Sequence, residues 1–166
     1  MDERRAEYLV ERYTDTLLRI GYTWFNSRDD AQDICQIVLI KALEDGRDFP
    51  DTGQERAFLI RMAINECKNW KKSAWFRRTV GLDEGEEFAV WDREPEEDGV
   101  LAQVQALPAK YRRVIYLRYY EGYGVAEIAG LLGESPALVS THLARAKAKL
   151  KSMLGGTNDG RVEQNL

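Results

Sequence analysis

The chain has 166 residues, of which 44% are hydrophobic and 31% charged, so it can bury one ordinary core or two small ones under a well-solvated surface. Its formal net charge is −4. No window approaches about 18 consecutive apolar residues, which excludes a transmembrane helix. The first residues, MDERRAEYLV, contain no apolar signal region, so we expect a cytoplasmic protein.

The first two predicted elements are helices. Apolar residues recur at helical spacing from about Arg4 to Phe25, and no stretch of the chain alternates like a strand. Ser27 is suited to cap a second helix, because its first turn carries two carboxylates that favour the helix dipole. That helix is predicted to end near Glu44, since Gly46 stands where a terminating glycine belongs.

A third helix is expected after the loop RDFPDTG. Thr52 and Glu55 have the spacing of a capping box, and the helical pattern then runs to about Lys72. The two cysteines, Cys35 and Cys67, each lie within an apolar-periodic stretch. We therefore expect both to be buried as small hydrophobic residues, which fits a reducing compartment.

The composition then changes abruptly. Residues 83–98 contain nine carboxylates and a single basic residue, Arg93. A block of like charge that contains Pro95, with Gly81, Gly85 and Gly99 in or beside it, cannot build a core, so it is interpreted as a linker. The predicted organisation is an all-α protein with a helical domain at 1–80, an acidic linker at 81–99, a second helical domain at 100–154 and a flexible tail at 155–166.

The second domain begins with a short helix that reaches Leu107. Pro108 is predicted to open a further helix, Ala109–Tyr120, that Gly122 ends. The helical spacing predicts that its inward face consists of Tyr111, Val114, Ile115, Leu117 and the stem of Arg118.

Residues 124–150 have the layout of a helix-turn-helix. Gly133 is placed to adopt the left-handed turn conformation, Ser135 to cap the following helix and Pro136 to open it. In that long helix a narrow apolar stripe is predicted to face the core, formed by Val139, Leu143, Ala146, Leu150 and Met153.

The opposite face of the long helix carries small polar residues and one arginine: Ala137, Ser140, Thr141, Ala144 and Arg145. Arg145 can contact a guanine through two hydrogen bonds, and the two hydroxyls suit bases or phosphates. Lys147 and Lys149 can contact phosphates. His142 lies on the flank, far from any ligand partner, so a phosphate or packing contact is expected and no metal. The alternative is a solvated amphipathic helix in a small bundle.

Aromatic and basic residues gather at the end of the third helix. The basic residues there are Arg61, Lys68, Lys71, Lys72, Arg77 and Arg78, and the aromatic ones are Trp70, Trp75 and Phe76. Basic charge can follow a phosphate backbone while exposed rings stack on unpaired bases. The same pattern also fits buried rings beside solvated charges, so spacing alone leaves both interpretations open.

Two blocks of this sequence resemble a known family. DDAQDICQIVLIKAL resembles its region-two pattern, and the block from LPAKYRRVIYLRYYEG to STHLARAKAKL resembles region four almost end to end. A weaker match is RAFLIRMAINECKNW. On these blocks the chain resembles the extracytoplasmic-function sigma factors of bacterial RNA polymerase, over roughly residues 5 to 154.

The resemblance implies a protein without catalytic activity or cofactor, whose partners are core RNA polymerase, promoter DNA and, for many members, an anti-sigma factor. Region two implies polymerase contacts through Asp33 and Gln36, with Lys41 nearby, and an unpaired base held at the loop Arg47–Gln54. The resemblance implies that Asn65, Asn69 and Trp70 meet melted −10 DNA. The basic pattern at the end of the third helix adds Lys68, Lys72 and Arg77 to this expected contact. The resemblance implies that Ser140, Thr141, Ala144 and Arg145 read the duplex −35 element, and the basic end of the helix adds Lys147 and Lys149 as phosphate contacts.

The chain departs from the family pattern at several positions. Ile37 replaces an acid, Leu39 an aromatic residue and Asn69 an aspartate, while Ser140 and His142 stand where basic residues are usual. The expected promoter preference therefore does not transfer.

Three other functions compete with this interpretation. A dimeric helix-turn-helix repressor would bind a palindrome unaided. A helical adaptor would bind only protein, which the uninterrupted basic helix argues against. An enzyme is least expected, because the sequence offers one histidine, no glycine-rich phosphate loop and no clustered metal ligands.

Overall fold

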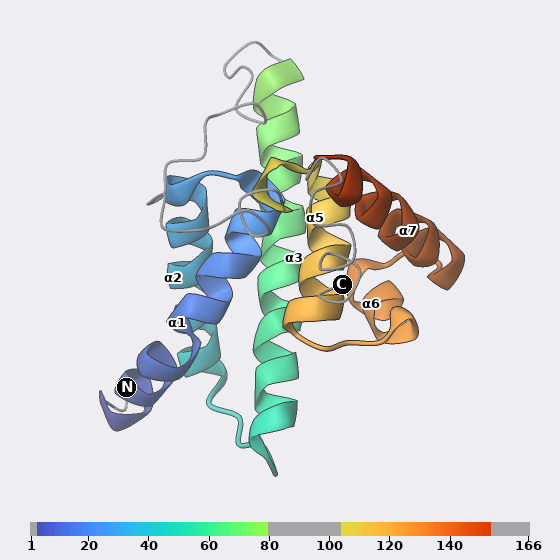
Figure 1. Cartoon of the computed structure of the whole chain (residues 1–166). Coiled ribbons are helices and arrows are strands. Elements are labelled where there is room, and N and C mark those ends of the chain that lie inside the picture. Colours follow the sequence, from blue (N-terminus) through green and yellow to red (C-terminus); the bar gives the residue numbers. More distant parts are fainter. Residues whose placement is uncertain (1–2, 80–103, 154–166) are drawn as a thin grey trace. The chain divides into compact units, whose positions relative to one another are not determined.

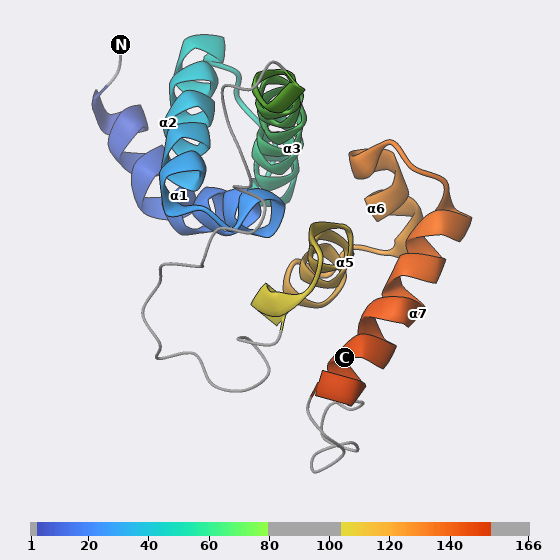
Figure 2. The same cartoon turned by 90° about the horizontal axis from the view of Figure 1, so that it is seen from above.

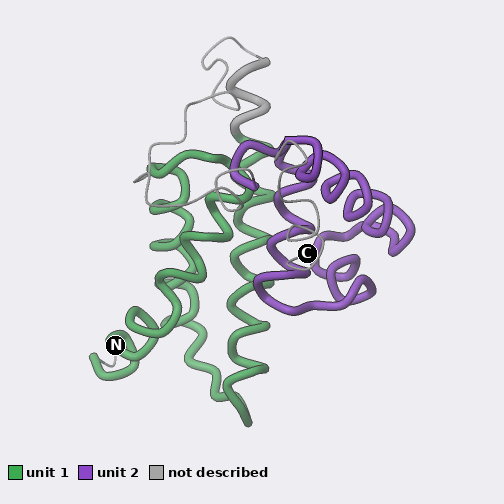
Figure 3. The backbone as a smooth tube through the Cα atoms, in the orientation of Figure 1, with its two compact units in different colours: residues 1–92 green, residues 93–166 purple. Residues whose placement is uncertain are grey.

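The computed structural model describes residues 3–79 and 104–153, with the backbone alone for residues 74–79. The chain divides into two compact units, residues 1–92 and 93–166 (Figure 3). Every regular element among the described residues is a helix, as the sequence predicts (Figure 1). The predicted linker and tail lie outside the described residues, so their boundaries stay predictions.

Unit 1 is built from three helices: α1 (Glu3–Phe25), α2 (Arg28–Asp45) and α3 (Thr52–Thr79). Each packs against the other two (Figure 2). The core is formed where their apolar stripes meet, because burial of these side chains supplies the main driving force for folding. Its largest fully buried members are Leu9, Tyr13, Leu17, Ile20, Ile34, Val38, Leu59, Ile60 and Ile64.

Helices α1 and α2 approach closely at Gly21. A Cβ atom at this position would lie 2.8 Å from Cα of Ala31 and 2.9 Å from its Cβ. Glycine and alanine therefore allow the two backbones to pack at this point, where larger residues would separate them.

The predicted ends of α2 are confirmed. Oγ of Ser27 accepts a hydrogen bond from the Asp30 backbone N–H at 3.3 Å. Gly46 adopts the left-handed conformation with φ +66°, and its N–H donates to the Ala42 carbonyl at 3.2 Å.

The start of α3 differs from the prediction. Asp51 caps the helix, because its Oδ1 accepts from the Gln54 N–H at 2.8 Å. The predicted capping box of Thr52 and Glu55 is therefore wrong, and the Glu55 side chain is buried instead. The helix also continues to Thr79 rather than ending near Lys72. The segment SAWFRRT contains neither glycine nor proline, so nothing in it ends a helix.

Unit 2 contains α5 (Ala109–Ile115), the π-helical turn η2 (Tyr116–Tyr120), α6 (Val125–Leu132) and α7 (Pro136–Met153). The predicted helix Ala109–Tyr120 is thus present, with a wider last turn in which the Glu121 N–H bonds the Tyr116 carbonyl at 3.1 Å. Pro108 precedes α5 rather than opening it.

The inward face of α5 and η2 is largely as predicted. Tyr111, Val114, Ile115 and Leu117 are buried. The expected burial of the Arg118 stem is wrong, because Arg118 is exposed and its guanidinium donates to the Tyr123 carbonyl at 3.1 Å.

The turn before α7 confirms the predicted helix-turn-helix geometry. Gly133 has φ +72°, and its N–H closes α6 by bonding the Ala129 carbonyl. Oγ of Ser135 accepts from the Leu138 N–H at 3.1 Å, and Pro136 is the first residue of α7.

Candidate nucleic-acid interface

The face of α7 predicted to read DNA points to solvent. Ser140, Ala144 and Arg145 are exposed and Thr141 is half-buried. Lys147 and Lys149 are exposed as well. The predicted stripe of Val139, Leu143, Ala146 and Leu150 is buried, whereas Met153 is 38% exposed and lies beyond the core. Unit 2 therefore exposes a side of α7 that is small and polar in its first half and basic from Arg145 onward, while the opposite side of the helix packs in the core.

His142 serves as a packing residue. Only 9% of it is exposed, and its ring meets the Tyr111 ring edge to face with centroids 5.7 Å apart. The sequence left a phosphate or packing contact open for this residue, and the structure favours packing.

Two exposed tyrosines of η2, one of them beside α7, were not singled out from the sequence. Tyr119 and Tyr120 are 36% and 55% exposed. The Lys147 ammonium lies 5.5 Å from the Tyr119 ring centroid, and the Arg118 guanidinium lies 5.9 Å from the same ring. In the sequence, the pair of adjacent tyrosines before Glu121 could have indicated an exposed aromatic site. Only the packing of the helices shows that Tyr119 lies beside Lys147.

The candidate −10 residues of α3 fall on two sides of the helix. Asn65, Lys68, Asn69 and Lys72 recur at intervals of three and four residues, and all four are exposed or half-buried. They form a continuous polar and basic face. The side chain of Arg77 lies outside the described residues.

Trp70 is held from a different helix. Its indole Nε1–H donates to Oδ1 of Asp30 at 3.0 Å, and the residue remains half-buried. Asp30 belongs to the first turn of α2, so this bond fixes the ring orientation at the edge of the polar α3 face.

The candidate polymerase contacts lie on α2. Asp33 and Gln36 are exposed, and Ile40, which sequence reasoning missed, is 50% exposed at the same helical spacing. Lys41 has a partner within the unit, because its ammonium lies 2.7 Å from Oε2 of the buried Glu66. The charge of Glu66 on α3 is thus neutralised by Lys41 of α2.

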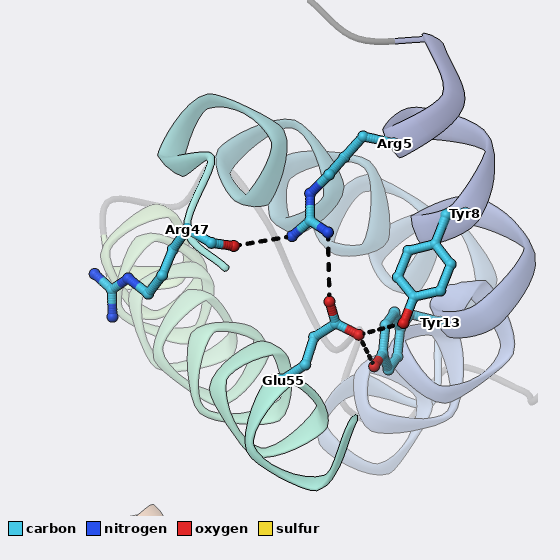
Figure 4. A network of polar contacts seen from close by, with 5 residues as sticks. All are labelled: Arg5, Tyr8, Tyr13, Arg47 and Glu55. Carbon is cyan, nitrogen blue, oxygen red and sulfur yellow. Dashed lines mark hydrogen bonds and ion pairs between the residues drawn. The ribbon is translucent and has the colours of Figure 1, made fainter. Parts of the chain in front are cut away.

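A polar network joins the starts of α1 and α3 (Figure 4). Glu55 is only 6% exposed, and its Oε1 accepts hydrogen bonds from the hydroxyls of Tyr8 and Tyr13, each at 2.6 Å. Its Oε2 lies 3.5 Å from Nη1 of Arg5. Nη2 of Arg5 donates to the Arg47 carbonyl at 3.2 Å, which links the network to the loop before α3.

The network keeps Glu55 ionised. Burial by itself raises the pKa of Glu55, but the hydrogen bonds from Tyr13 and Tyr8 and the charge of Arg5 outweigh it, so its pKa lies below the usual value. Burial, followed by the bond to Glu55, raises the pKa of Tyr13. For Tyr8 the bond to Glu55 is the larger cause of a raised pKa. A carboxylate therefore faces two protonated hydroxyls.

The cysteines are buried as predicted, with Cys35 5% and Cys67 0% exposed. Burial raises the pKa of the Cys35 thiol to about 11, so it stays protonated and unreactive at neutral pH. In the part of the chain that the structure describes, no three His, Cys, Asp or Glu side chains are grouped to hold a metal ion. None of the helices described there has the length and hydropathy of a membrane span.

Comparison with known proteins decides between the competing functions. The family model of sigma-70 region 2 matches residues 9–77, and that of sigma-70 region 4 matches residues 98–150. The sigma factor SigV of Bacillus subtilis is 30% identical over 142 residues, which cover 82% of each chain. This chain belongs to the extracytoplasmic-function sigma factors of RNA polymerase. It is a transcription initiation factor, and the repressor alternative is not favoured.

Other proteins similar to this sigma factor agree. The extracytoplasmic-function sigma factor SigM of Mycobacterium tuberculosis H37Rv is 26% identical over 162 residues, 96% of this chain and 82% of SigM. CnrH, solved with the cytosolic domain of CnrY, matches with a TM-score of 0.54 and 26% identity over 94% of this chain and 91% of CnrH. The sigma factor RpoE of Bartonella quintana, solved with the anti-sigma factor NepR, shares the fold: its TM-score is 0.66 at 18% identity, over 89% of this chain and 95% of RpoE.

Proposed function

We propose that this sigma factor binds core RNA polymerase and gives the holoenzyme its promoter preference, with unit 2 on the −35 element and unit 1 on the −10 element. The observation that carries the proposal is the outward face of α7. Ser140, Ala144 and Arg145 stand exposed at the positions where a recognition helix meets base edges.

In unit 2 the side-chain chemistry of α7 separates the residues that contact bases from those that contact phosphates. Arg145 reads a guanine by two hydrogen bonds in the major groove, while Ser140, Thr141 and Ala144 shape the contact with neighbouring bases. Lys147 and Lys149 fix the register by contacting phosphates, which carry no sequence information.

In unit 1 the polar α3 face of Asn65, Lys68, Asn69 and Lys72 lies along the separated −10 strand, with Arg77 further along the same helix. Trp70 offers an aromatic face to an unpaired base, and the loop Arg47–Gln54 contributes the contact that the family resemblance implies. Asp33 and Gln36 on α2, together with Lys41, contact the core enzyme.

The factor itself carries out no catalysis and works in the cytoplasm, where RNA polymerase acts. An anti-sigma factor is the further partner in this proposal. CnrH, at 26% identity over nearly its whole length, was solved with the cytosolic domain of CnrY bound, which supports regulation of this chain by a protein partner.

Single-round transcription in vitro tests the proposal, with core polymerase, the full chain and a library of promoters varied at −35 and −10. Arg145→Ala is expected to reduce preference at one −35 position about tenfold, because one bidentate base contact is lost. Arg28→Ala, which removes an exposed arginine at the start of α2, is the matched control and should leave the −35 preference unchanged. The proposal fails if the chain directs no promoter-specific initiation or if Arg145→Ala leaves every preference intact.

A further inference from the structure

The segment from Gly46 to Asp51, here called the 46–51 segment, connects α2 to α3 without regular structure. Its ends are fixed by backbone and capping bonds, from the Gly46 N–H to the Ala42 carbonyl and from the Gln54 N–H to Asp51. Its side chains Arg47 and Phe49 both lie against the Phe58 ring, at 4.7 Å and 5.1 Å from the ring centroid. Side-chain packing thus anchors the segment to α3.

Near the start of the segment, the backbone carbonyl of Arg47 is bound by a side chain of α1. Figure 4 shows the Arg47 carbonyl facing the guanidinium of Arg5, while the Arg47 side chain points the other way. Nη2 of Arg5 donates to this carbonyl at 3.2 Å. The same guanidinium contacts Oε2 of Glu55 through Nη1, at 3.5 Å. Arg5 therefore connects the segment to a carboxylate of α3.

Glu55, the carboxylate that Arg5 contacts, is itself held in place by its surroundings. Glu55 is almost fully buried, and two tyrosine hydroxyls from α1 hold its Oε1 at 2.6 Å. A planar guanidinium with two donors in use can hold a carboxylate and a carbonyl in a fixed relative orientation. Helix α1 thus holds the Arg47 peptide through one side chain, in addition to the contacts of the Arg47 side chain with Phe58 and Asp45.

We propose that Arg5 is a positioning residue for promoter recognition, which holds the 46–51 segment in the orientation in which it meets −10 DNA. This inference rests on the proposed function of unit 1. It adds a role for the first turn of α1 that neither the family blocks nor the candidate site residues include.

A first experiment tests the structural link without DNA. The Arg47 carbonyl belongs to the peptide bond that trypsin cuts after Arg47, so loosening this peptide should expose it to the protease. Arg5→Met is expected to increase cleavage between Arg47 and Asp48 about fivefold in the full chain, measured by mass spectrometry of the fragments. Cleavage after Arg61, inside α3, should stay unchanged, which separates local loosening from global unfolding. Arg28→Met, which removes an exposed arginine at the start of α2, is the matched control.

A second experiment measures the −10 preference of the holoenzyme at each base position. Arg5→Met should reduce the preference at one −10 position about fivefold while the −35 preference stays intact, and Arg5→Lys should restore part of it. An equal loss at every promoter, or no change in either experiment, overturns the inference. If the wild-type chain itself shows no −10 preference, the proposed role of unit 1 fails, whereas the protease result still decides whether Arg5 holds the segment.

Discussion

At the scale of single residues, the buried carboxylates Glu55 and Glu66 and the half-buried Trp70 of α3 each bind a partner on another helix. Glu55 binds Tyr8 and Tyr13, Lys41 binds Glu66, and Trp70 binds Asp30. Leaving a buried polar group without a partner lowers the free energy of unfolding by more than a satisfied hydrogen bond raises it. Each pair therefore restricts how the helices can pack. The same pairs orient side chains at the proposed interfaces.

The Glu55 network predicts a pH-dependent contribution to stability. Because the folded pKa of Glu55 lies below its usual value of 4.5, its contribution is present above that pH and is lost as the pH falls through the lower folded value. Glu55→Gln should lower the free energy of unfolding by about 1–3 kcal/mol at neutral pH. Urea unfolding should show this difference shrinking in acid below pH 4.5, while Glu11→Gln on the exposed face of α1 has little effect at any pH. A difference that stays constant down to the acid limit of folding would contradict the assignment.

The bond from Trp70 to Asp30 predicts a selective defect in promoter melting. Asp30→Ala frees the indole, so the ring should lose its fixed orientation toward the separated strand. Permanganate footprinting of the holoenzyme should then show about three- to tenfold less open complex, since one hydrogen bond is lost. Asp29→Ala, at the exposed neighbouring position of the same helix turn, is the control. Equal footprints for the two variants would remove Asp30 from this role.

At the scale of helices, local signals decide where elements begin and end. Ser27, Gly46, Gly133 and Ser135 act where the sequence predicts them to act, since a cap involves only residues within about one turn. One exception is the start of α3, where Asp51 caps the helix and Glu55 turns inward. Both Asp51 and Thr52 could cap this helix. Because Glu55 is buried against two tyrosines, it cannot complete a capping box with Thr52, and Asp51 caps the helix instead.

The close approach of α1 and α2 predicts opposite effects for two glycine substitutions. Gly21→Ala places a methyl group 2.8 Å from Cα of Ala31, so the helices must separate. This should destabilise unit 1 by about 1–3 kcal/mol despite the better helix propensity of alanine. Gly130→Ala on α6, where a Cβ meets nothing within 4 Å, should instead stabilise its helix by up to about 1 kcal/mol. Urea unfolding followed by circular dichroism measures both, and a neutral Gly21→Ala would refute the close packing.

At the scale of the whole molecule, charge is divided along the chain. The described face of α7 is basic, whereas nine carboxylates fall within residues 83–98 and give the chain its net charge of −4. An acidic segment repels DNA from the free protein and lowers non-specific binding. The factor would then engage a promoter only within the polymerase.

This division predicts how the free chain binds DNA. Replacing the nine carboxylates of residues 83–98 by their amides should raise the affinity of the isolated chain for promoter DNA by about tenfold, because the repulsion is removed. Filter binding over a range of salt concentrations measures it. Replacing Glu7, Glu11 and Asp15 on the exposed side of α1 by amides removes three negative charges elsewhere, and its effect, compared per charge removed, shows how much of the gain comes from net charge alone. Tight binding by the unmodified chain at physiological salt, or no gain after neutralisation, would contradict the role of the acidic segment.

The sequence by itself determined the helices, most of their caps, the helix-turn-helix and the outward face of α7, because each depends on residues within a few positions of one another. The family resemblance followed from the same local blocks. Only the tertiary structure decided that Glu55 binds Tyr8 and Tyr13, 47 and 42 residues away, and that Trp70 binds Asp30, 40 residues away. Such partners depend on which helix faces meet and on the axial register of one helix against the other. Helical periodicity identifies the buried face of each helix, but it does not specify which side chain of another helix that face contacts.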